Sequence, residues 1–391
     1  MSHVLIFAFS DFGHFAPTLA VSRLLVERGH RVSYVLDEAT RPVVEAVGAR
    51  LVGYPAARSR LSGGASVDSN ELHEVGLSFL ADSTRMVLPA AREAFADDLP
   101  DLILYDYESF VAARTLARDW DRPTLQYFPY VASNEKYSLH AEVFDADSPE
   151  VDRAVEAVFE ALSGIEPDEE RVWAMMAAHD EHNLVFLPRE FQPAGDTFDE
   201  RYTFVGHCVP DTPPGVEWAP PAGADRVVLI SLGTESNERA GFFRTCAEAF
   251  ADGGWHAVMT LGRGNTAHDI PAAANLEAHE WLPHTAVLPS ADVLVCHGGM
   301  GSIIEALYFR RPVVVVPHTP EHTVNGRRIA ELGLGALLEG ELNAESLRSV
   351  VERVTGDEGI RERVARMSEA IRAGGGAPRA ADEVEHFLSK N

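Results

Sequence analysis

Short apolar runs alternate with amphipathic, helix-like segments along this chain. Four runs in the first half predict buried parallel strands, and they are Val4–Phe9, Arg31–Leu36, Asp101–Asp106 and Pro123–Tyr127. After a loop at Ser10–Ala16, we expect a helix from Pro17 until Gly29, because proline is favoured at a helix start and glycine just beyond its end. Strands that alternate with helices in this way predict a doubly wound α/β sheet.

The same alternation begins again after a proline-rich stretch at residues 209–223, which is typical of an interdomain linker. Arg226–Thr234 predicts a strand that ends in a glycine turn. At 391 residues the chain is also too long for one ordinary core. We therefore expect an N-terminal domain of residues 1–208, a C-terminal domain of residues 224–376, and a ligand in the cleft between them.

Composition excludes several classes of function. A net charge of −27 argues against nucleic-acid partners and anionic membrane surfaces. The only lysines are Lys136 and Lys390, so the chain has no Gly-Lys-Ser/Thr phosphate loop and no lysine in a setting suited to a Schiff base. Three widely spaced cysteines signal neither a disulfide framework nor a zinc site. Without a signal peptide or a run of ~18 apolar residues, we expect a soluble, cytoplasmic protein with no membrane insertion.

A glycine cluster in the second half carries the clearest chemistry. The strand Val293–Cys296 stops at His297, a helical pattern starts at Ser302, and a second strand follows at Val313–Val316. The intervening glycines let backbone approach a phosphate, and the helix start offers free N–H groups to an anion. This βαβ unit predicts a diphosphate site. In the simpler interpretation, Ser302 and Glu305 form a capping box that only holds the helix end.

Two flanking motifs favour the diphosphate interpretation. Trp281-Leu282-Pro283-His284 lies about a dozen residues upstream, and Pro320-Glu321-His322 lies just past the second strand. Together with the glycine turn they resemble the donor-binding signature of family 1 glycosyltransferases of the macrolide and natural-product type. That family has the GT-B fold, in which two Rossmann-like doubly wound domains face a cleft. The resemblance also implies that a final helix, residues 377–391, crosses back to the N-terminal domain.

The resemblance assigns the donor site residue by residue. Trp281 would stack on the base, and the backbone of Leu282 would pair with the base edge. Glu305 would hold the ribose, and the Glu321-His322 pair would hold the sugar hydroxyls. The diphosphate would be held by His297, Gly299, Gly301, Ser302 and, after its own strand, Thr234. The family usually has aspartate-glutamine where this chain has Glu321-His322, and glutamine where it has His284, which leaves the identity of the donor open.

A base for the acceptor hydroxyl is expected in the N-terminal half. Gly13-His14-Phe15-Ala16-Pro17 resembles the family's Gly-His-x-x-Pro loop, which carries its catalytic histidine. Asp106, at the tip of its strand, matches the family's supporting aspartate, which would orient the imidazole and stabilise the imidazolium. From the residues alone, His14 could equally be a solvated loop histidine and Asp106 a helix N-cap.

Two metal-like patterns are weaker. His318-Thr319-Pro320-Glu321-His322 matches the zinc-peptidase pattern H-x-x-E-H, but the proline predicts a loop that would not bring both histidines to one face. Asp145-Ala146-Asp147 matches a D-x-D motif but lies in an acidic stretch away from a strand tip, which indicates solvated surface. We therefore expect no metal and no cofactor.

The resemblance implies an inverting transfer of a hexose from a nucleotide-sugar to a hydroxyl of a hydrophobic small molecule such as a macrolide, polyketide or phenolic. UDP-glucose is the favoured donor, with a dTDP-sugar second, and the protein would act as a monomer or homodimer. Two alternatives stay open at this point: a nucleotide-sugar epimerase of the same fold, and a non-catalytic accessory protein that binds a nucleotide-sugar.

Overall fold

The computed structural model describes residues 1–55, 84–143, 180–208, 215–233, 239–252, 254–262, 264–340 and 342–390, with isolated residues between 156 and 178. The chain divides into two compact units. One takes the described residues up to 208 together with 374–390, and the other takes those from 215 to 373. The D-x-D pair Asp145 and Asp147, and the proposed phosphate ligand Thr234, lie outside the described residues.

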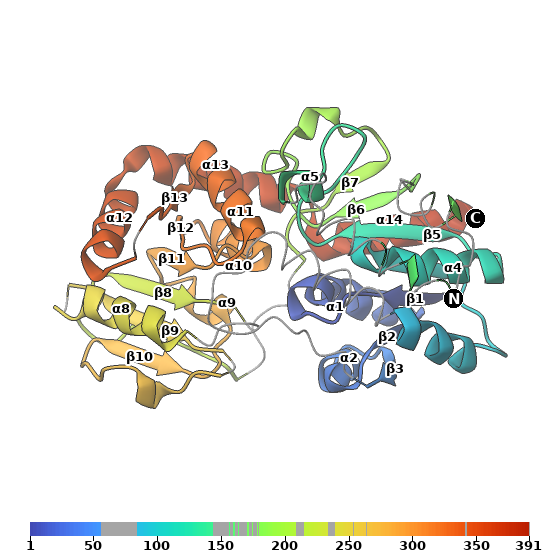
Figure 1. Ribbon diagram of the computed structural model, residues 1–391, viewed down its shortest axis with the longest axis horizontal. Coiled ribbons are helices and arrows are strands. Elements are labelled where there is room, and N and C mark those ends of the chain that lie inside the picture. The colour runs from blue at the N-terminus through green and yellow to red at the C-terminus, as the bar shows by residue number, and fades with distance from the viewer. Residues whose placement is uncertain are drawn as a thin grey trace. The chain divides into compact units, whose positions relative to one another are not determined.

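A seven-stranded parallel sheet forms the first unit, in the order β3-β2-β1-β4-β5-β6-β7 (Figure 1). Its strands are β1 (His3–Phe7), β2 (Arg31–Asp37), β3 (Arg50–Tyr54), β4 (Leu102–Asp106), β5 (Thr124–Phe128), β6 (Asn183–Val185) and β7 (Tyr202–Phe204). The helices that we use below are α1 (Phe12–Glu27), α2 (Arg41–Glu45), α4 (Phe110–Trp120), α5 (Leu139–Val143) and α14 (Gly376–Lys390).

Both faces of this sheet are buried, which explains why its strands are apolar at successive positions. In β1, Val4 and Ile6 pack into a cluster that includes residues of α1 and α14, whereas Leu5 and Phe7 pack with residues of α4. The C-terminal helix α14 lies against α1, and Arg28 forms ion pairs with Asp382 and Glu385 of α14. The last helix therefore completes the first unit, although the second unit precedes it in the chain.

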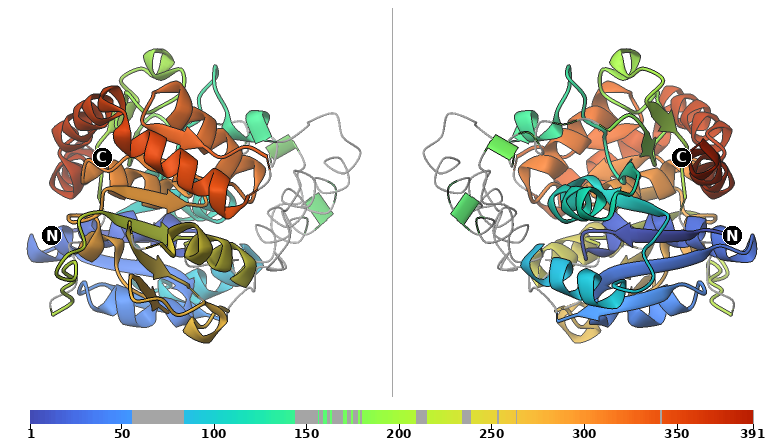
Figure 2. Two further views of the ribbon diagram at one scale, coloured as in Figure 1. Left: turned by 90° about the vertical axis from the view of Figure 1, so that its left-hand side faces the viewer. Right: turned by 90° about the vertical axis from the view of Figure 1, so that its right-hand side faces the viewer.

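The second unit contains a six-stranded parallel sheet in the order β10-β9-β8-β11-β12-β13. Its strands are β8 (Val227–Ser231), β9 (His256–Thr260), β10 (Leu276–His279), β11 (Val293–Cys296), β12 (Val313–Val315) and β13 (Gly335–Leu337). Its helices are α8 (Ala240–Phe250), α9 (His284–Val287), α10 (Met300–Tyr308), α11 (Pro320–Glu331), α12 (Ala344–Gly356) and α13 (Glu358–Ala373). Helices α8 and α12 pack together (Figure 2), and α10 packs against α13.

Three helix starts differ from the sequence prediction. Helix α1 begins at Phe12, so Pro17 lies inside it and His14 occupies its first turn instead of a loop. A proline removes one helical hydrogen bond, and packing of the buried face of α1 against the sheet outweighs that loss. Helix α10 begins at Met300 with Gly299 as N-cap, so the Ser302–Glu305 capping box is wrong.

The third difference is at residues 320–322, where a loop was expected. Helix α11 begins at Pro320, and the hydroxyl of Thr319 accepts the backbone N–H of His322 at 3.2 Å. Threonine at the N-cap followed by proline is a strong helix-start signal, since the first N–H groups have no helical partner. Glu321 and His322 therefore lie in the first turn of a helix.

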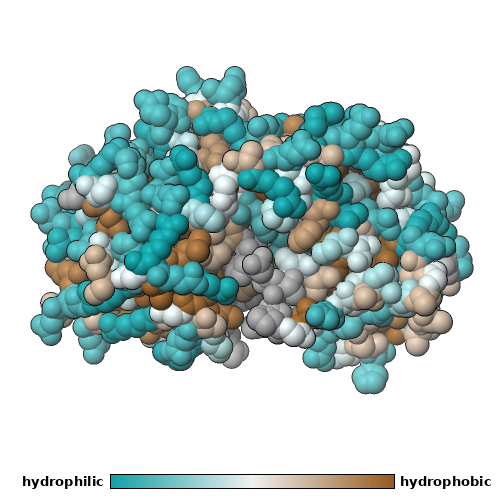
Figure 3. Space-filling view, turned by 180° about the vertical axis from the view of Figure 1, so that it is seen from behind, coloured by the Kyte–Doolittle hydropathy of each residue, from teal (hydrophilic) through white to brown (hydrophobic). Residues whose placement is uncertain are grey.

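On the face shown in Figure 3, hydrophilic residues predominate and apolar residues lie in smaller patches between them. Within the described part of the chain, no helix is both long enough and apolar enough to cross a membrane.

Candidate active site

The first candidate site lies where the chain order of the first sheet reverses, between the neighbouring strands β1 and β4. His14 is in the first turn of α1, the helix that follows β1, and Asp106 is the last residue of β4. His14 Nδ1 lies 2.7 Å from Asp106 Oδ2. The Asp106 side chain is fully buried, whereas that of His14 is 22% exposed. The structure thus places these two residues in direct contact, with the histidine still accessible.

The charge on this pair follows from its surroundings. A carboxylate can only accept, so His14 donates from Nδ1, and Asp106 Oδ1 accepts the backbone N–H of Glu108 at 3.0 Å. Burial by itself lowers the pKa of the His14 imidazole, but the Asp106 carboxylate outweighs burial and raises the pKa to about 9. A buried aspartate beside the imidazole therefore favours the imidazolium, as the acid of a catalytic triad does.

Three further residues surround His14 that the sequence did not indicate. The rings of Phe9 and Tyr130 lie 4.9 and 5.5 Å from the His14 ring, centroid to centroid. The Tyr130 hydroxyl donates to Glu108 at 2.6 Å. Burial raises the pKa of the Glu108 carboxyl, but hydrogen bonds from His140 and Tyr130 outweigh it and lower the pKa to about 2. In the sequence, Glu108 could have been found only through its position two residues after Asp106.

The second candidate site is the glycine turn of the second unit, again where the strand order reverses, between β8 and β11. Gly298 has φ +107°, and a Cβ there would lie 2.9 Å from a methyl of Val315. A Cβ on Gly299 would lie 2.5 Å from His297 Nε2. Side chains at these positions would displace the histidine or the turn, so glycine is required. The turn leads into the N-terminus of α10, whose first N–H groups have no helical partner.

Three histidines gather beside this turn. The ring of His297 lies 4.5 Å from that of His322 and 6.3 Å from that of His318, centroid to centroid. Burial lowers the pKa of His297 to about 3 and that of His318 to about 4, and it holds the pKa of His322 well below its usual value. The three imidazoles are therefore neutral near pH 7. In the described part of the chain, no three or more His, Cys, Asp or Glu side chains are arranged to hold a metal ion.

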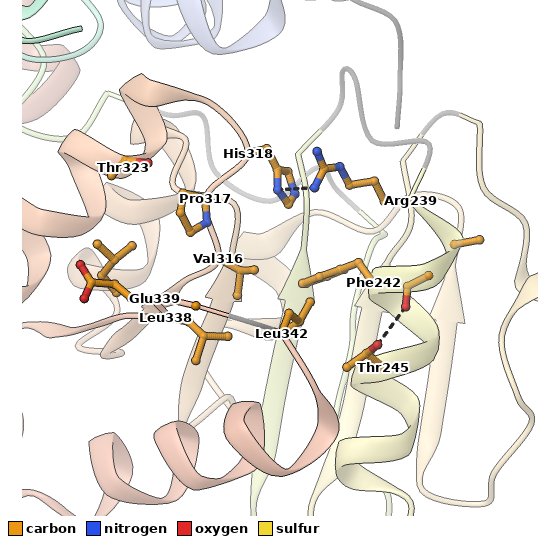
Figure 4. A pocket seen from close by; sticks show the side chains of 14 residues that line it. Arg239, Phe242, Thr245, Val316, Pro317, His318, Thr323, Leu338, Glu339 and Leu342 are labelled. Carbon is orange, nitrogen blue, oxygen red and sulfur yellow. Dashed lines mark hydrogen bonds between the residues drawn. The ribbon is translucent and has the colours of Figure 1, made fainter. Parts of the chain in front are cut away.

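A cavity of about 820 Å³ opens beside His318, within the second unit. Figure 4 shows Arg239 and His318 pointing toward one another, with the guanidinium donating to His318 Nδ1 at 2.8 Å. The wall includes apolar side chains of Phe242, Leu338 and Leu342. This volume is in the range of small-molecule pockets.

The residues expected to hold the nucleoside are found at separate places in the second unit. Trp281 follows β10 and is 63% exposed, which is unusual for a tryptophan and leaves its face free for stacking. Leu282 next to it is half-buried. Glu305 lies on α10 and accepts a hydrogen bond from His284, 3.0 Å away, so the two motif residues are in contact.

Comparison with known proteins identifies the family. Residues 256–385 match the family described as erythromycin biosynthesis protein CIII-like, C-terminal domain. The chain is 39% identical to demethyllactenocin mycarosyltransferase of Streptomyces fradiae, over 100% of this chain and 87% of that protein. It is 34% identical to the oleandomycin glycosyltransferase of Streptomyces antibioticus, over 99% and 91% of the two chains. These relatives do not favour the epimerase or the accessory-protein alternative.

The fold gives the same result. The crystal structure of CalG4, the calicheamicin glycosyltransferase, superposes with a TM-score of 0.85 at 37% identity, over 100% of this chain and 98% of that one. The glycosyltransferase of kitacinnamycin superposes with a TM-score of 0.82 at 32% identity, over 99% of each chain. The chain is therefore a nucleotide-sugar-dependent glycosyltransferase of the GT-B fold and belongs to the natural-product glycosyltransferases of family 1.

Proposed function

We propose that this enzyme transfers a hexose, with inversion and without a metal ion, to a hydroxyl group of a hydrophobic natural product such as a macrolide. The observation that carries the proposal is the 2.7 Å contact between His14 and the buried Asp106. The names of the relatives, which refer to demethyllactenocin and oleandomycin, support an acceptor of the antibiotic type. In this proposal residues 1–208 bind the acceptor and residues 224–376 bind the nucleotide-sugar.

The proposed step is a direct displacement. His14 uses Nδ1 toward Asp106, and its Nε2 takes the proton of the acceptor hydroxyl. The hydroxyl oxygen forms a bond to the anomeric carbon as the bond from that carbon to the diphosphate oxygen breaks. Asp106 then stabilises the imidazolium through its charge and its hydrogen bond. The aromatic rings of Phe9 and Tyr130 beside His14 supply apolar surface for the acceptor.

The leaving diphosphate gains negative charge in this step, and the glycine turn is built to receive it. We propose that His297, Gly299, Gly301 and Ser302 bind the diphosphate at the start of α10, with Thr234 as a further donor. Free backbone N–H groups and the positive end of the helix dipole stabilise the negative charge of the diphosphate, as a divalent cation does in metal-dependent enzymes. Trp281 and Leu282 would hold the base, and Glu305 the ribose.

A transfer assay tests this function and its metal independence together. Purified enzyme is incubated with UDP-glucose or a dTDP-hexose, with and without a macrolide or phenolic acceptor, in buffer containing EDTA, and products are read by mass spectrometry. We expect an acceptor-dependent hexoside, and activity unchanged by EDTA. An interconverted donor sugar without acceptor would indicate an epimerase, and loss of activity in EDTA with rescue by Mn²⁺ would contradict the metal-free site.

A second prediction concerns the sugar. We propose that Glu321 and His322, in the first turn of α11, hold hexose hydroxyls, since a carboxylate accepts from two hydroxyls and a neutral imidazole can both donate and accept. Glu321→Ala is expected to weaken binding of the nucleotide-sugar roughly tenfold, the value of one hydrogen bond to a charged group, and to leave binding of free UDP unchanged. Calorimetric titration with both ligands measures the two affinities.

The matched control is Glu331→Ala, at the exposed end of the same helix, where the carboxylate meets Arg328 at 3.5 Å. That change should alter neither affinity. An equal loss for UDP and for the sugar donor in Glu321→Ala would show that Glu321 supports the fold of the turn and does not contact the sugar.

A further inference from the structure

A series of hydrogen bonds joins three elements of the second unit. Ser231, the last residue of β8, has its Oγ 3.0 Å from Nε2 of His284. Nδ1 of the same imidazole lies 3.0 Å from Oε2 of Glu305 on α10. The backbone N–H of Gly233 donates to Ser231 Oγ at 3.2 Å. Three side chains from three elements are thus joined end to end.

The direction of each hydrogen bond follows from the groups involved. A carboxylate carries no proton, so His284 Nδ1 must be the donor to Glu305. In the neutral imidazole Nε2 is then an acceptor, and Ser231 supplies its hydroxyl proton to it. Ser231 Oγ is free to do so because it accepts, and does not donate, in its contact with Gly233. With this one assignment of protons, each of these hydrogen bonds has a donor and an acceptor. The bonds therefore hold the Glu305 side chain in a fixed orientation.

This arrangement has the order of a Ser-His-Glu triad, but Ser231 cannot act as a nucleophile. The residue is 1% exposed at the end of a central strand, and its oxygen is occupied by the Gly233 N–H. The consequence lies at the other end of this series of hydrogen bonds, at Glu305, whose side chain is 15% exposed. One carboxylate oxygen, Oε2, is held by His284, and among the described residues Oε1 has no hydrogen-bond partner, so it can meet a ligand.

We propose that His284, held by Ser231, is a specificity-determining residue that leaves Glu305 one oxygen for the nucleoside sugar, so that the enzyme binds 2′-deoxyribonucleoside and ribonucleoside diphosphates alike. This inference rests on the proposed function, in which Glu305 meets the ribose. A glutamate with both oxygens free would accept from the 2′- and the 3′-hydroxyl, and a 2′-deoxy ligand would leave one oxygen unpaired. Two neighbouring hydroxyls are held best when both carboxylate oxygens face them. Oε2 of Glu305 faces His284 instead, so the second hydroxyl adds little to binding.

The test uses two ligands that differ only in the 2′-hydroxyl, UDP and 2′-deoxyuridine diphosphate. Calorimetric titration of the wild-type enzyme should give dissociation constants within about threefold of each other. His284→Leu removes the donor to Oε2 and should make UDP the preferred ligand by about tenfold, the effect of one hydrogen bond to a charged group. His279→Leu is the matched control, because His279 also contacts a glutamate of this unit, Glu277, at 3.0 Å. The control should keep the wild-type ratio.

A wild-type preference for UDP of more than about threefold, or an unchanged ratio in a folded His284→Leu variant, would overturn the inference. If His284→Leu does not fold, the wild-type ratio alone decides the question. Binding of neither nucleotide would refute the proposed function itself, whereas binding of both with a strong preference for UDP would refute only the role of His284.

Discussion

Replacing His14 with alanine is expected to lower the rate of sugar transfer at least ~10²-fold, the contribution of a positioned general base. The residue is in contact with buried Asp106 at 2.7 Å, so the imidazole has one defined orientation and one ring nitrogen for the acceptor. Nucleotide binding should remain intact, because every described residue proposed to bind the donor lies in the other compact unit. Steady-state kinetics with a saturating donor, together with titration of UDP, measure the two effects.

His30→Ala is the matched control for this change. His30 belongs to the same unit and also meets a carboxylate, Glu385, at 3.0 Å, but that pair joins the turn after α1 to α14. We expect its transfer rate to stay near the wild-type value. A normal rate in His14→Ala with a hydroxyl acceptor would show that His14 is not the base, and a parallel loss of UDP binding would point to misfolding.

The second large effect is expected from Asp106→Asn, read as a pH profile of kcat/KM. In the wild type, only neutral His14 can accept a proton, so the rate should rise about tenfold per pH unit and level off near pH 9, where the imidazole loses its charge. Asparagine keeps an accepting oxygen but carries no charge. Burial then dominates, the His14 pKa falls, and the rise should occur at lower pH, with a plateau roughly 10- to 10²-fold below the wild type.

The same ion pair links stability to pH. The His14 pKa in the folded protein is raised above its usual value of 6.5, so the pair stabilises the fold fully below pH 6.5 and loses that contribution as pH rises through about 9. Asp98→Asn, which alters an exposed ion pair with Arg31, serves as the control. It should shift neither the pH profile of kcat/KM nor the loss of stability between pH 6.5 and 9. If Asp106→Asn kept the wild-type rate and pH dependence, Asp106 would have no part in the mechanism.

Much of the fold could be predicted from the sequence because the signals are local. The strand at Val293–Cys296 was predicted correctly at both ends, because the limits of a short apolar run also mark the limits of the buried strand that it forms. Gly29 was correctly placed beyond the end of α1, with φ +90°, because only glycine adopts that conformation without strain. The start of α1 was predicted five residues late, since the usual preference for proline at a helix start did not account for the stability that packing gives to its first turns.

The sequence by itself determined the two α/β halves, the glycine turn after β11, the place of His14 between β1 and β2 and that of Asp106 at the end of β4, because each depends on residue types close together in the chain. Tertiary structure alone decided which side chains touch. His14 and Asp106 are 92 positions apart, and Ser231 and His284 are 53 apart. Parallel strands need long crossovers, so the residues that meet at the carboxyl edge of a sheet are remote in sequence. Their pairing, and with it the charge of His14 and the orientation of Glu305, follows from strand order.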